Sequence, residues 1–294
     1  ADATPKAERT TAWEAENSAE DSCVWGGRLE IVYVRFQEST DAQVVEDVAR
    51  SAKVPLTVYQ VVDSGVQNST AGMSEAYTSI GLQFLHESFS NHTCFRLRFM
   101  PNHGRESPSY LQYLVERYDT LPSWVIFING PLIHFSAKQL RCFAGPAVPK
   151  HKIEADSPDF VPFPTQLVLG RWQHYRDFWP GYTDLWEGWT KARSLPAHMP
   201  PSPSAIKNVS MYCCGQFAAS RRAIMRNPRR FYEFALSYAL LSNGANLGKA
   251  KQRDRLANYH INWAGAGFEH IWHIMFGEPI HEQQWKALCR SPDG

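Results

Sequence analysis

The chain has 294 residues, of which 44% are hydrophobic and 20% charged, with a formal net charge of +1. This balance is typical of a protein with a full hydrophobic core and excludes an intrinsically disordered chain. The near-neutral charge argues against nucleic-acid binding, because no domain-wide basic field is present to displace counterions. A local group of basic residues, which we interpret as a solvated helix face, comprises Arg221, Arg222, Arg226, Arg229 and Arg230.

The first 27 residues are polar and lack hydrophobic periodicity. They predict a tail or stem that precedes a single α/β domain at residues 28–294. No stretch of the chain approaches the roughly 20 apolar residues that a membrane-spanning helix requires. Because the sequence begins at Ala1 rather than Met, removal of an upstream signal or anchor is a further expectation.

The chain contains 6 cysteines, an even number that suits a set of disulfide bonds, although the sequence does not rank the pairings. No Cys-x-x-Cys pair occurs, which argues against a structural zinc site. Glycosylation sequons begin at Asn68, Asn91 and Asn208. Together these features predict the lumen of the secretory pathway or the extracellular space. The alternative is a cytosolic protein with six buried free thiols.

An apolar strand at residues 29–34, a helix at 42–52 and a second strand at 55–62 form a βαβ unit with parallel strands. The expected fold class is therefore α/β, with a mostly parallel sheet flanked by helices. A Trp/Pro-rich insertion with little periodicity follows at residues 143–205. The remaining expected elements are a strand at 95–99, a helix at 110–118, a strand at 124–128, and helices at 221–226, 228–242 and 269–276.

Polar residues follow three of the predicted strands, where ligands bind to open parallel sheets. The alternative is that these are ordinary loop residues, since every strand end carries some. We expect Arg35, Asn102, Arg105, Glu106 and Asn129 to converge on one cleft. The full set is Arg35 and Glu38 after the first strand, Asn102, Gly104, Arg105 and Glu106 after the third, and Asn129, Gly130 and His134 after the fourth.

A further candidate lies at the start of the predicted last helix. Gly265 and Gly267 allow a sharp turn, after which Glu269 falls in the first helical turn, where unpaired backbone N–H groups keep a carboxylate ionised. Glu269 is thus a candidate catalytic base and His270 a residue that tunes or orients it. A helix-capping glutamate is the alternative. His270 and His273 share a helix face and could bind a metal, although we favour a structural role for this pair.

Seven short motifs resemble a widespread family known only as a domain of unknown function, from about residue 29 to about residue 280. The aromatic segment in the middle is poorly matched. The motifs are residues 34–38, 101–107 with 110–111, 118–122, 125–128, 216–220, 228–232, and 269–272 with 276–278.

The layout of these motifs in turn resembles the GT-A type of glycosyltransferase. The resemblance implies a nucleotide-binding-like half at 28–142 and an acceptor-side half at 206–294. It also implies a nucleotide-sugar pocket lined by the first strand exit and by the Asn102–Glu106 turn, with Glu269 as the base. These enzymes usually carry Asp-x-Asp at the fourth strand exit to hold a divalent cation, whereas residues 129–134 contain no aspartate.

The sequence therefore predicts a lumenal or secreted glycosyltransferase-like protein that uses a nucleotide sugar, with or without a divalent cation, and a carbohydrate or glycoprotein acceptor. In this hypothesis Arg35 and Arg105 offset the charge of the diphosphate. Trp172, Trp179, Trp186 and Trp189 would offer flat faces to sugar rings, or else form a hydrophobic cover. The alternatives are a non-catalytic carbohydrate-binding or scaffold protein and a less favoured His-based metalloenzyme using His103, His134, His270 or His273.

Overall fold

The computed structural model describes residues 27–36, 42–62, 94–101, 106–130, 137–144, 159–163, 167–171, 181–192, 194–202, 208–212, 215–241, 268 and 271–277. The predicted tail at residues 1–27 lies outside this part except for Gly27. No described helix is long and apolar enough to cross a membrane. Two cysteines are described, Cys94 and Cys142, and neither is a free thiol.

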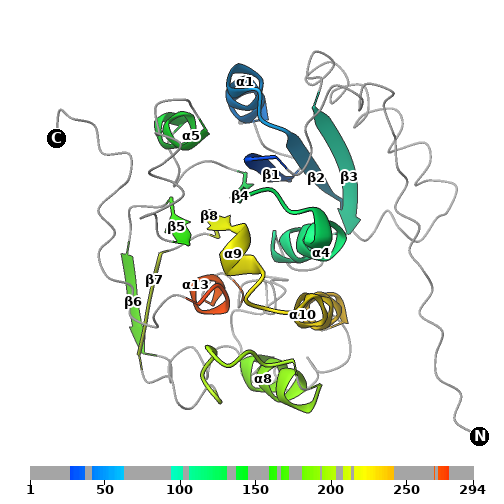
Figure 1. Ribbon diagram of the computed structural model, residues 1–294, viewed down its shortest axis with the longest axis vertical. Coiled ribbons are helices and arrows are strands. Elements are labelled where there is room, and N and C mark those ends of the chain that lie inside the picture. The colour runs from blue at the N-terminus through cyan, green and yellow to red at the C-terminus, as the bar shows by residue number, and fades with distance from the viewer. Residues whose placement is uncertain are drawn as a thin grey trace, which may run out of the picture.

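The fold is α/β, with a mixed six-stranded sheet in the order β3-β2-β1-β4-β8-β5 (Figure 1). Neighbouring strands from β3 to β4 are parallel, whereas β8 is antiparallel to both β4 and β5. A separate two-stranded sheet pairs β6 with β7. The strands are β1 (Leu29–Arg35), β2 (Leu56–Val62), β3 (Phe95–Pro101), β4 (Trp124–Asn129), β5 (Phe160–Pro162), β6 (Leu167–Arg171), β7 (Asn208–Tyr212) and β8 (Phe217–Ser220).

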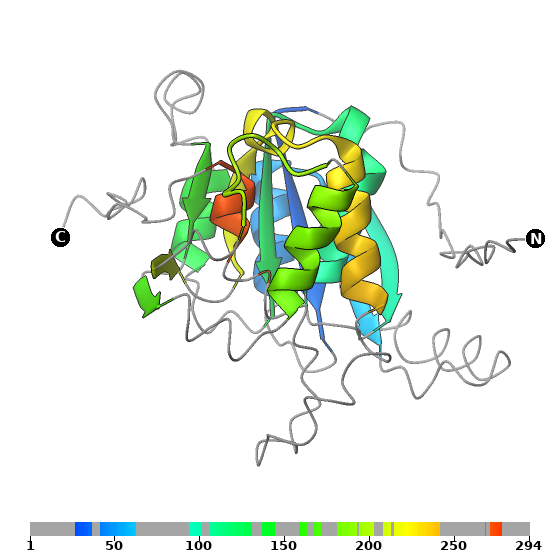
Figure 2. The same ribbon diagram turned by 90° about the horizontal axis from the view of Figure 1, so that it is seen from below.

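Helices cover both faces of the large sheet (Figures 1 and 2). On one face lie α1 (Ala42–Ala52) and α5 (Ala137–Ala144), which contact each other. On the other face α4 (Ser107–Arg117) packs against α10 (Arg229–Leu241), which in turn contacts α8 (Gly181–Lys191). The short helices α9 (Arg221–Ile224) and α13 (Trp272–Met275) complete this side.

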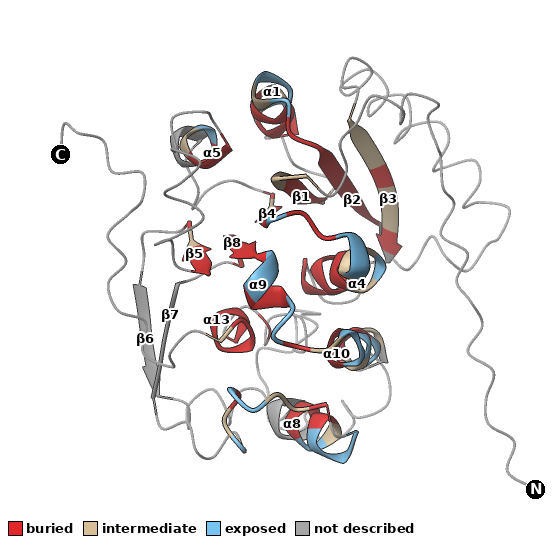
Figure 3. Ribbon diagram, viewed as in Figure 1, coloured by how far each residue is buried: buried red, intermediate tan, exposed pale blue. Residues whose placement is uncertain are grey.

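The apolar pattern of the sequence explains these layers. In β1, Val32 and Val34 pack into the core on the α4 side, while Ile31 and Tyr33 pack into the core on the α1 side. A strand buried on both faces needs a continuous apolar run, which is what residues 31–34 provide. By contrast, α1 turns only one apolar face inward, as Figure 3 shows by its single buried side.

The structure confirms the α1 boundaries and shifts several others. Helix α4 begins at Ser107, three residues before the expected segment at 110–118, and Pro108 lies in its first turn, as the Ser107-Pro108 pair predicts for a helix opening. The expected last helix at 269–276 contains α13, which runs from Trp272 to Met275 with Ile271 as its N-cap, while Glu269 lies outside the described residues. The insertion at 143–205 is also more regular than its composition indicates, because β5, β6 and α8 lie within it.

Two tryptophans that were expected to face sugar rings are part of the core instead. Trp186 is 1% exposed, and its Nε1 donates to Pro200 O at 2.8 Å. Trp189 is fully buried, and its ring stacks on Phe231 with a centroid distance of 4.3 Å. The hydrophobic-cover interpretation is therefore correct for both residues. Trp172 and Trp179 lie outside the described residues.

Candidate ligand site at the carboxyl edge of the sheet

The strand order creates a topological switch point between β1 and β4. After β1 the chain passes through α1 to β2, on one side of β1 in the sheet, whereas after β4 it passes through α5 to β5, at the opposite edge of the sheet (Figure 1). At such a point the connections diverge from the carboxyl ends of two adjacent strands, and ligands bind there. The residues at these ends are Arg35 on β1 and Asn129 with Gly130 on β4, with Val34 and Asn129 paired across the ladder.

Arg35 brings a cation to the switch point. The residue is 8% exposed, and its backbone carbonyl accepts a hydrogen bond from Gln60 Nε2 at 3.4 Å. Burial lowers the pKa of the Arg35 guanidinium, while the nearby Tyr33 raises it. A guanidinium stays protonated near neutral pH even after such a decrease. The end of β1 therefore carries a largely desolvated positive charge, which is what recognition of an anionic ligand requires.

Asn129 and Gly130 join the ends of three strands. Gly130 N donates to Val34 O at 3.0 Å, which extends the pairing of β4 with β1 by one bond. Gln216, which immediately precedes β8, donates from Nε2 to both Asn129 O at 3.0 Å and Asn129 Oδ1 at 2.6 Å. Because β8 is antiparallel to β4, its first residue lies at the edge where β4 ends. Amide and guanidinium groups thus gather on adjacent strand ends.

Glu106 lies immediately before α4 and is 2% exposed. Its carbonyl accepts from Tyr110 N at 3.1 Å, but its carboxylate forms no capping bond with the helix. Helix α4 contacts β1, so Glu106 begins an element that packs against the same strand that carries Arg35.

The expected convergence of Arg35, Asn102, Arg105, Glu106 and Asn129 on one cleft stays a prediction, and the other predicted site residues lie outside the described residues. His273 is described and is 2% exposed within α13. Among the described residues, no three His, Cys, Asp or Glu side chains gather in a way that could hold a metal ion. The predicted residues outside the described part are Glu38, Asn102, Gly104, Arg105, His134, Glu269, His270, Asn68 and Asn91, together with the side chain of Asn208 in β7.

Two glutamines at this edge were not predicted as site residues. Gln60 holds the backbone at the end of β1, and Gln216 holds Asn129. Both are buried, at 8% and 2% exposure. A polar residue inside the apolar run at 56–62 was the available signal for Gln60. Gln216 belonged to a recognised motif, but its role depends on the antiparallel pairing of β8, which the sequence did not reveal.

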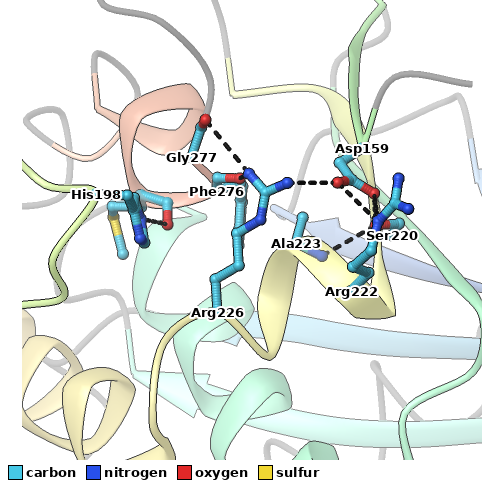
Figure 4. A network of polar contacts seen from close by, with 9 residues as sticks. Asp159, His198, Ser220, Arg222, Ala223, Arg226, Phe276 and Gly277 are labelled. Carbon is cyan, nitrogen blue, oxygen red and sulfur yellow. Dashed lines mark hydrogen bonds and ion pairs between the residues drawn. The ribbon is translucent and has the colours of Figure 1, made fainter.

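A second polar cluster lies at the opposite, amino edge of the parallel strands and is shown in Figure 4. We call it the Asp159 cluster: Asp159, Ser220, Arg222 and Arg226. Asp159 is 6% exposed and accepts from Ser220 Oγ at 2.6 Å, from Arg222 Nε at 2.9 Å and from Arg226 Nη2 at 2.7 Å. Ser220 Oγ also accepts from Ala223 N at 3.0 Å and thereby caps α9.

The Asp159 cluster also holds the segment that follows α13. Arg226 Nη1 donates to the carbonyl oxygens of Phe276 and Gly277, at 3.2 and 3.3 Å (Figure 4). The expectation that the arginines form one solvated helix face is therefore wrong in part. They divide between α9, the following turn and α10, and Arg229 pairs with Asp119 and Glu233.

A family model described as "Protein of unknown function (DUF3431)" matches residues 86–148 and 171–291. This is more than half of the chain, so the chain belongs to that family. The predicted resemblance to a family of unknown function is thus confirmed, although the motif at residues 34–38 lies outside the match. The comparisons with curated proteins and with solved structures found no match.

Proposed function

We propose that this member of the DUF3431 family is a glycosyltransferase-like protein of the GT-A type, which binds a nucleotide sugar at the carboxyl ends of β1 and β4. The observation that supports it most is Arg35 at the switch point beside Asn129. A diphosphate carries several negative charges, and a planar guanidinium in a partly desolvated position binds such a group strongly. The parallel strand order from β3 to β4 is compatible with this class of site.

In the proposed reaction, Glu269 accepts the proton of an acceptor hydroxyl as the hydroxyl oxygen attacks the anomeric carbon of the donor sugar. The bond between that carbon and the diphosphate oxygen breaks, and the electron pair leaves with the nucleoside diphosphate. Arg35 and Arg105 offset the negative charge that grows on the leaving oxygen. The products are the glycosylated acceptor, the nucleoside diphosphate and a proton.

Binding of nucleoside diphosphates tests this proposal. A ligand that binds only the folded state raises stability by about 2.7 kcal/mol when it is present at about 100 times its Kd. We expect uridine or guanosine diphosphate to raise the melting temperature of the wild type, and Arg35→Met to weaken binding by about tenfold or more.

Arg50→Met is the matched control, because Arg50 lies on the exposed side of α1, where it pairs with Glu46 and Asp47. It should leave the affinity unchanged. A wild type that no nucleoside diphosphate stabilises, or an Arg35 variant that binds as tightly as the wild type, would refute the proposal.

A second candidate function is a non-catalytic carbohydrate-binding or scaffold protein on the same fold. The absence of aspartate from residues 129–134 favours it. The two candidates differ in turnover, because only the enzyme hydrolyses or transfers sugar from a bound nucleotide sugar.

We also propose that the protein resides in the secretory lumen or outside the cell and that its cysteines are disulfide-bonded. The state of Cys94 and Cys142, neither of which is a free thiol, supports this, as do the three sequons. Thiol titration of denatured, unreduced protein should give few free groups. A value near the full number of six cysteines would contradict both parts of the proposal.

A further inference from the structure

The contact between Gln216 and Asn129 fixes which way the Asn129 amide faces. Gln216 Nε2 lies 3.0 Å from the backbone oxygen of Asn129, and a backbone carbonyl oxygen can only accept a hydrogen bond. The nitrogen of the Gln216 amide must therefore face this oxygen. The same nitrogen lies 2.6 Å from the Asn129 side chain, so the atom there must be the acceptor Oδ1. The two N–H donors on Asn129 Nδ2 point away from Gln216.

Gln216 is itself held firmly in this position. It is 2% exposed, and its backbone oxygen accepts from Phe163 N at 3.0 Å. Gly215 precedes it with φ +62°, a conformation that costs glycine little and lets the chain enter β8 at this point. The two hydrogen bonds that Gln216 donates to Asn129 are therefore part of the folded framework, because the backbone around Gln216 is held by these contacts.

Two hydrogen-bonding groups remain at the end of β4. Among the described residues, Asn129 Nδ2 donates no hydrogen bond, and the residue is half-buried at the sheet edge. Gln216 Oε1 is buried and has no hydrogen-bond partner in the part of the chain that the structure describes. A buried acceptor without a partner is costly and only a hydrogen-bond donor can satisfy it, so the groups here that can bind an acceptor of a ligand are the N–H groups of Asn129.

This arrangement does not fit the divalent cation that the GT-A resemblance implies at this strand end. Magnesium and manganese bind carboxylate or carbonyl oxygens. The side-chain oxygen of Asn129 is committed to Gln216, and what Asn129 presents instead is a pair of N–H groups, whose positive ends repel a cation. The same N–H groups suit phosphate oxygens, which are strong acceptors.

From this disagreement we infer that the end of β4 binds the ligand diphosphate directly through the amide N–H groups of Asn129, oriented by Gln216, so that diphosphate binding does not require a divalent cation. The inference rests on the proposed function, because it concerns the same ligand and the same strand ends. Asn129 contacts the ligand, and Gln216 is a positioning residue that acts through Asn129. Arg35, at the adjacent end of β1, supplies the balancing positive charge.

Calorimetric titration of the full chain with inorganic pyrophosphate and with uridine or guanosine diphosphate tests the inference. We expect the Kd in EDTA to lie within about threefold of the Kd in magnesium or manganese. Binding that is about tenfold or more tighter with the cation overturns the inference and leaves the proposed function standing. Absence of binding in every buffer overturns both. Binding of pyrophosphate alone keeps the inference for a phosphate ligand and argues against a nucleotide donor.

A pair of variants separates the positioning role of Gln216 from a merely structural one. In Gln216→Glu the carboxylate can only accept, so the Asn129 amide must rotate, which turns Oδ1 outward beside a new negative charge. We expect pyrophosphate affinity in EDTA to fall about tenfold and to recover when magnesium is added. Gln216→Met, the control of similar volume, removes the hydrogen bonds without adding an oxygen and should not gain cation dependence.

Asn129→Asp provides a second route if the glutamate variant does not fold. Its carboxylate still accepts from Gln216 Nε2 but offers no N–H group to the ligand. It should therefore show the same loss in EDTA and the same recovery in magnesium. Wild-type affinity in EDTA for either folded variant would overturn the inference.

Discussion

The two edges of the large sheet use polar residues in opposite ways. At the amino edge, the carboxylate of Asp159 accepts from a serine and two arginines, and Arg226 continues to two backbone carbonyls beyond α13. At the carboxyl edge, a single glutamine fixes one asparagine and leaves N–H donors and a buried acceptor at the end of β4. The first arrangement joins segments distant in sequence, and the second leaves hydrogen-bonding groups without partners among the described residues.

The difference shows that buried polar residues alone do not identify a binding site. Asp159 and Gln216 are both almost fully buried, at 6% and 2% exposure. The hydrogen bonds of Asp159 are made within the chain, so its burial is compensated by the fold. Among the described residues, Gln216 Nε2 donates to Asn129, whereas Gln216 Oε1 has no hydrogen-bond partner. A structural cluster differs from a candidate site in whether each donor and acceptor has a hydrogen-bond partner, and not in the type of residue.

The largest loss of stability that we expect comes from Asp159→Ala, which tests the structural role of the amino edge. Removal of this carboxylate leaves Ser220 Oγ and two guanidinium groups without their shared acceptor. The free energy of unfolding should fall by about 3 kcal/mol, as measured by urea denaturation. At temperatures where the variant is folded, its affinity for nucleoside diphosphate should equal that of the wild type.

Asp119→Ala is the matched control for this prediction. Asp119 also pairs with an arginine of the same segment, Arg229, but its side chain is 77% exposed. Exposed pairs contribute little, so the expected change is within about 0.5 kcal/mol. If Asp159→Ala weakened ligand binding without lowering stability, the division of roles between the two edges would be wrong.

A smaller change in the free energy of unfolding, of opposite sign, is expected when Glu30 is replaced. Glu30 is a fully buried carboxyl group in the amino half of β1. Burial raises the pKa of Glu30, and this outweighs the lowering influence of Arg117, of the hydrogen bond from Thr57, of Tyr113 and of Arg96. An acid whose folded-state pKa is raised binds more protons in the folded state. Its contribution to stability is therefore greatest at low pH and declines as pH rises from about 4.5 through the folded-state pKa.

Glu30→Gln removes this titration and can still accept from Thr57. We expect stability near pH 7 to be unchanged or to rise by up to about 1 kcal/mol, with the difference from the wild type growing as pH rises through that window. Melting curves recorded across the pH range measure it. Glu187→Gln, which changes a 58% exposed carboxylate on α8, should show no such trend. A difference that shrinks with rising pH would show that Glu30 is stabilised as an ion and belongs to a compensated cluster like that of Asp159.

The local pattern of apolar residues predicted the strands and helices whose burial depends on neighbouring residues in the sequence. The run at 31–34 and the amphipathic spacing of 42–52 correctly gave β1 and α1, because burial on two faces or on one leaves a direct trace in the sequence. The strands β5 and β6 were missed, since each is short and begins among proline and polar residues. The sequence left Trp186 and Trp189 open between a sugar-binding surface and a hydrophobic cover. The stacking of Trp189 on Phe231 and the hydrogen bond from Trp186 to Pro200 O depend on contacts that no local pattern reveals.

The sequence predicted those residues of the candidate site that lie at the carboxyl ends of parallel strands. Arg35 and Asn129 were identified because parallel strands bring their carboxyl ends to one edge. Gln216 was not, because its position depends on β8 entering the sheet between β4 and β5 in the antiparallel direction. No local pattern in residues 217–220 distinguishes that direction from the parallel one.

The shortness of β8 limits how members of this family can vary in length. The strand has only 4 residues, with Gln216 immediately before it and Ser220 as its last residue. At about 3.3 Å per residue, it spans the whole distance between the hydrogen bonds of Asn129 and the Asp159 cluster. An insertion or deletion of one residue within it would turn Phe217 out of the core and displace a contact at one end or the other. Family members should therefore tolerate length changes in the loops that flank this strand but none between Gln216 and Ser220.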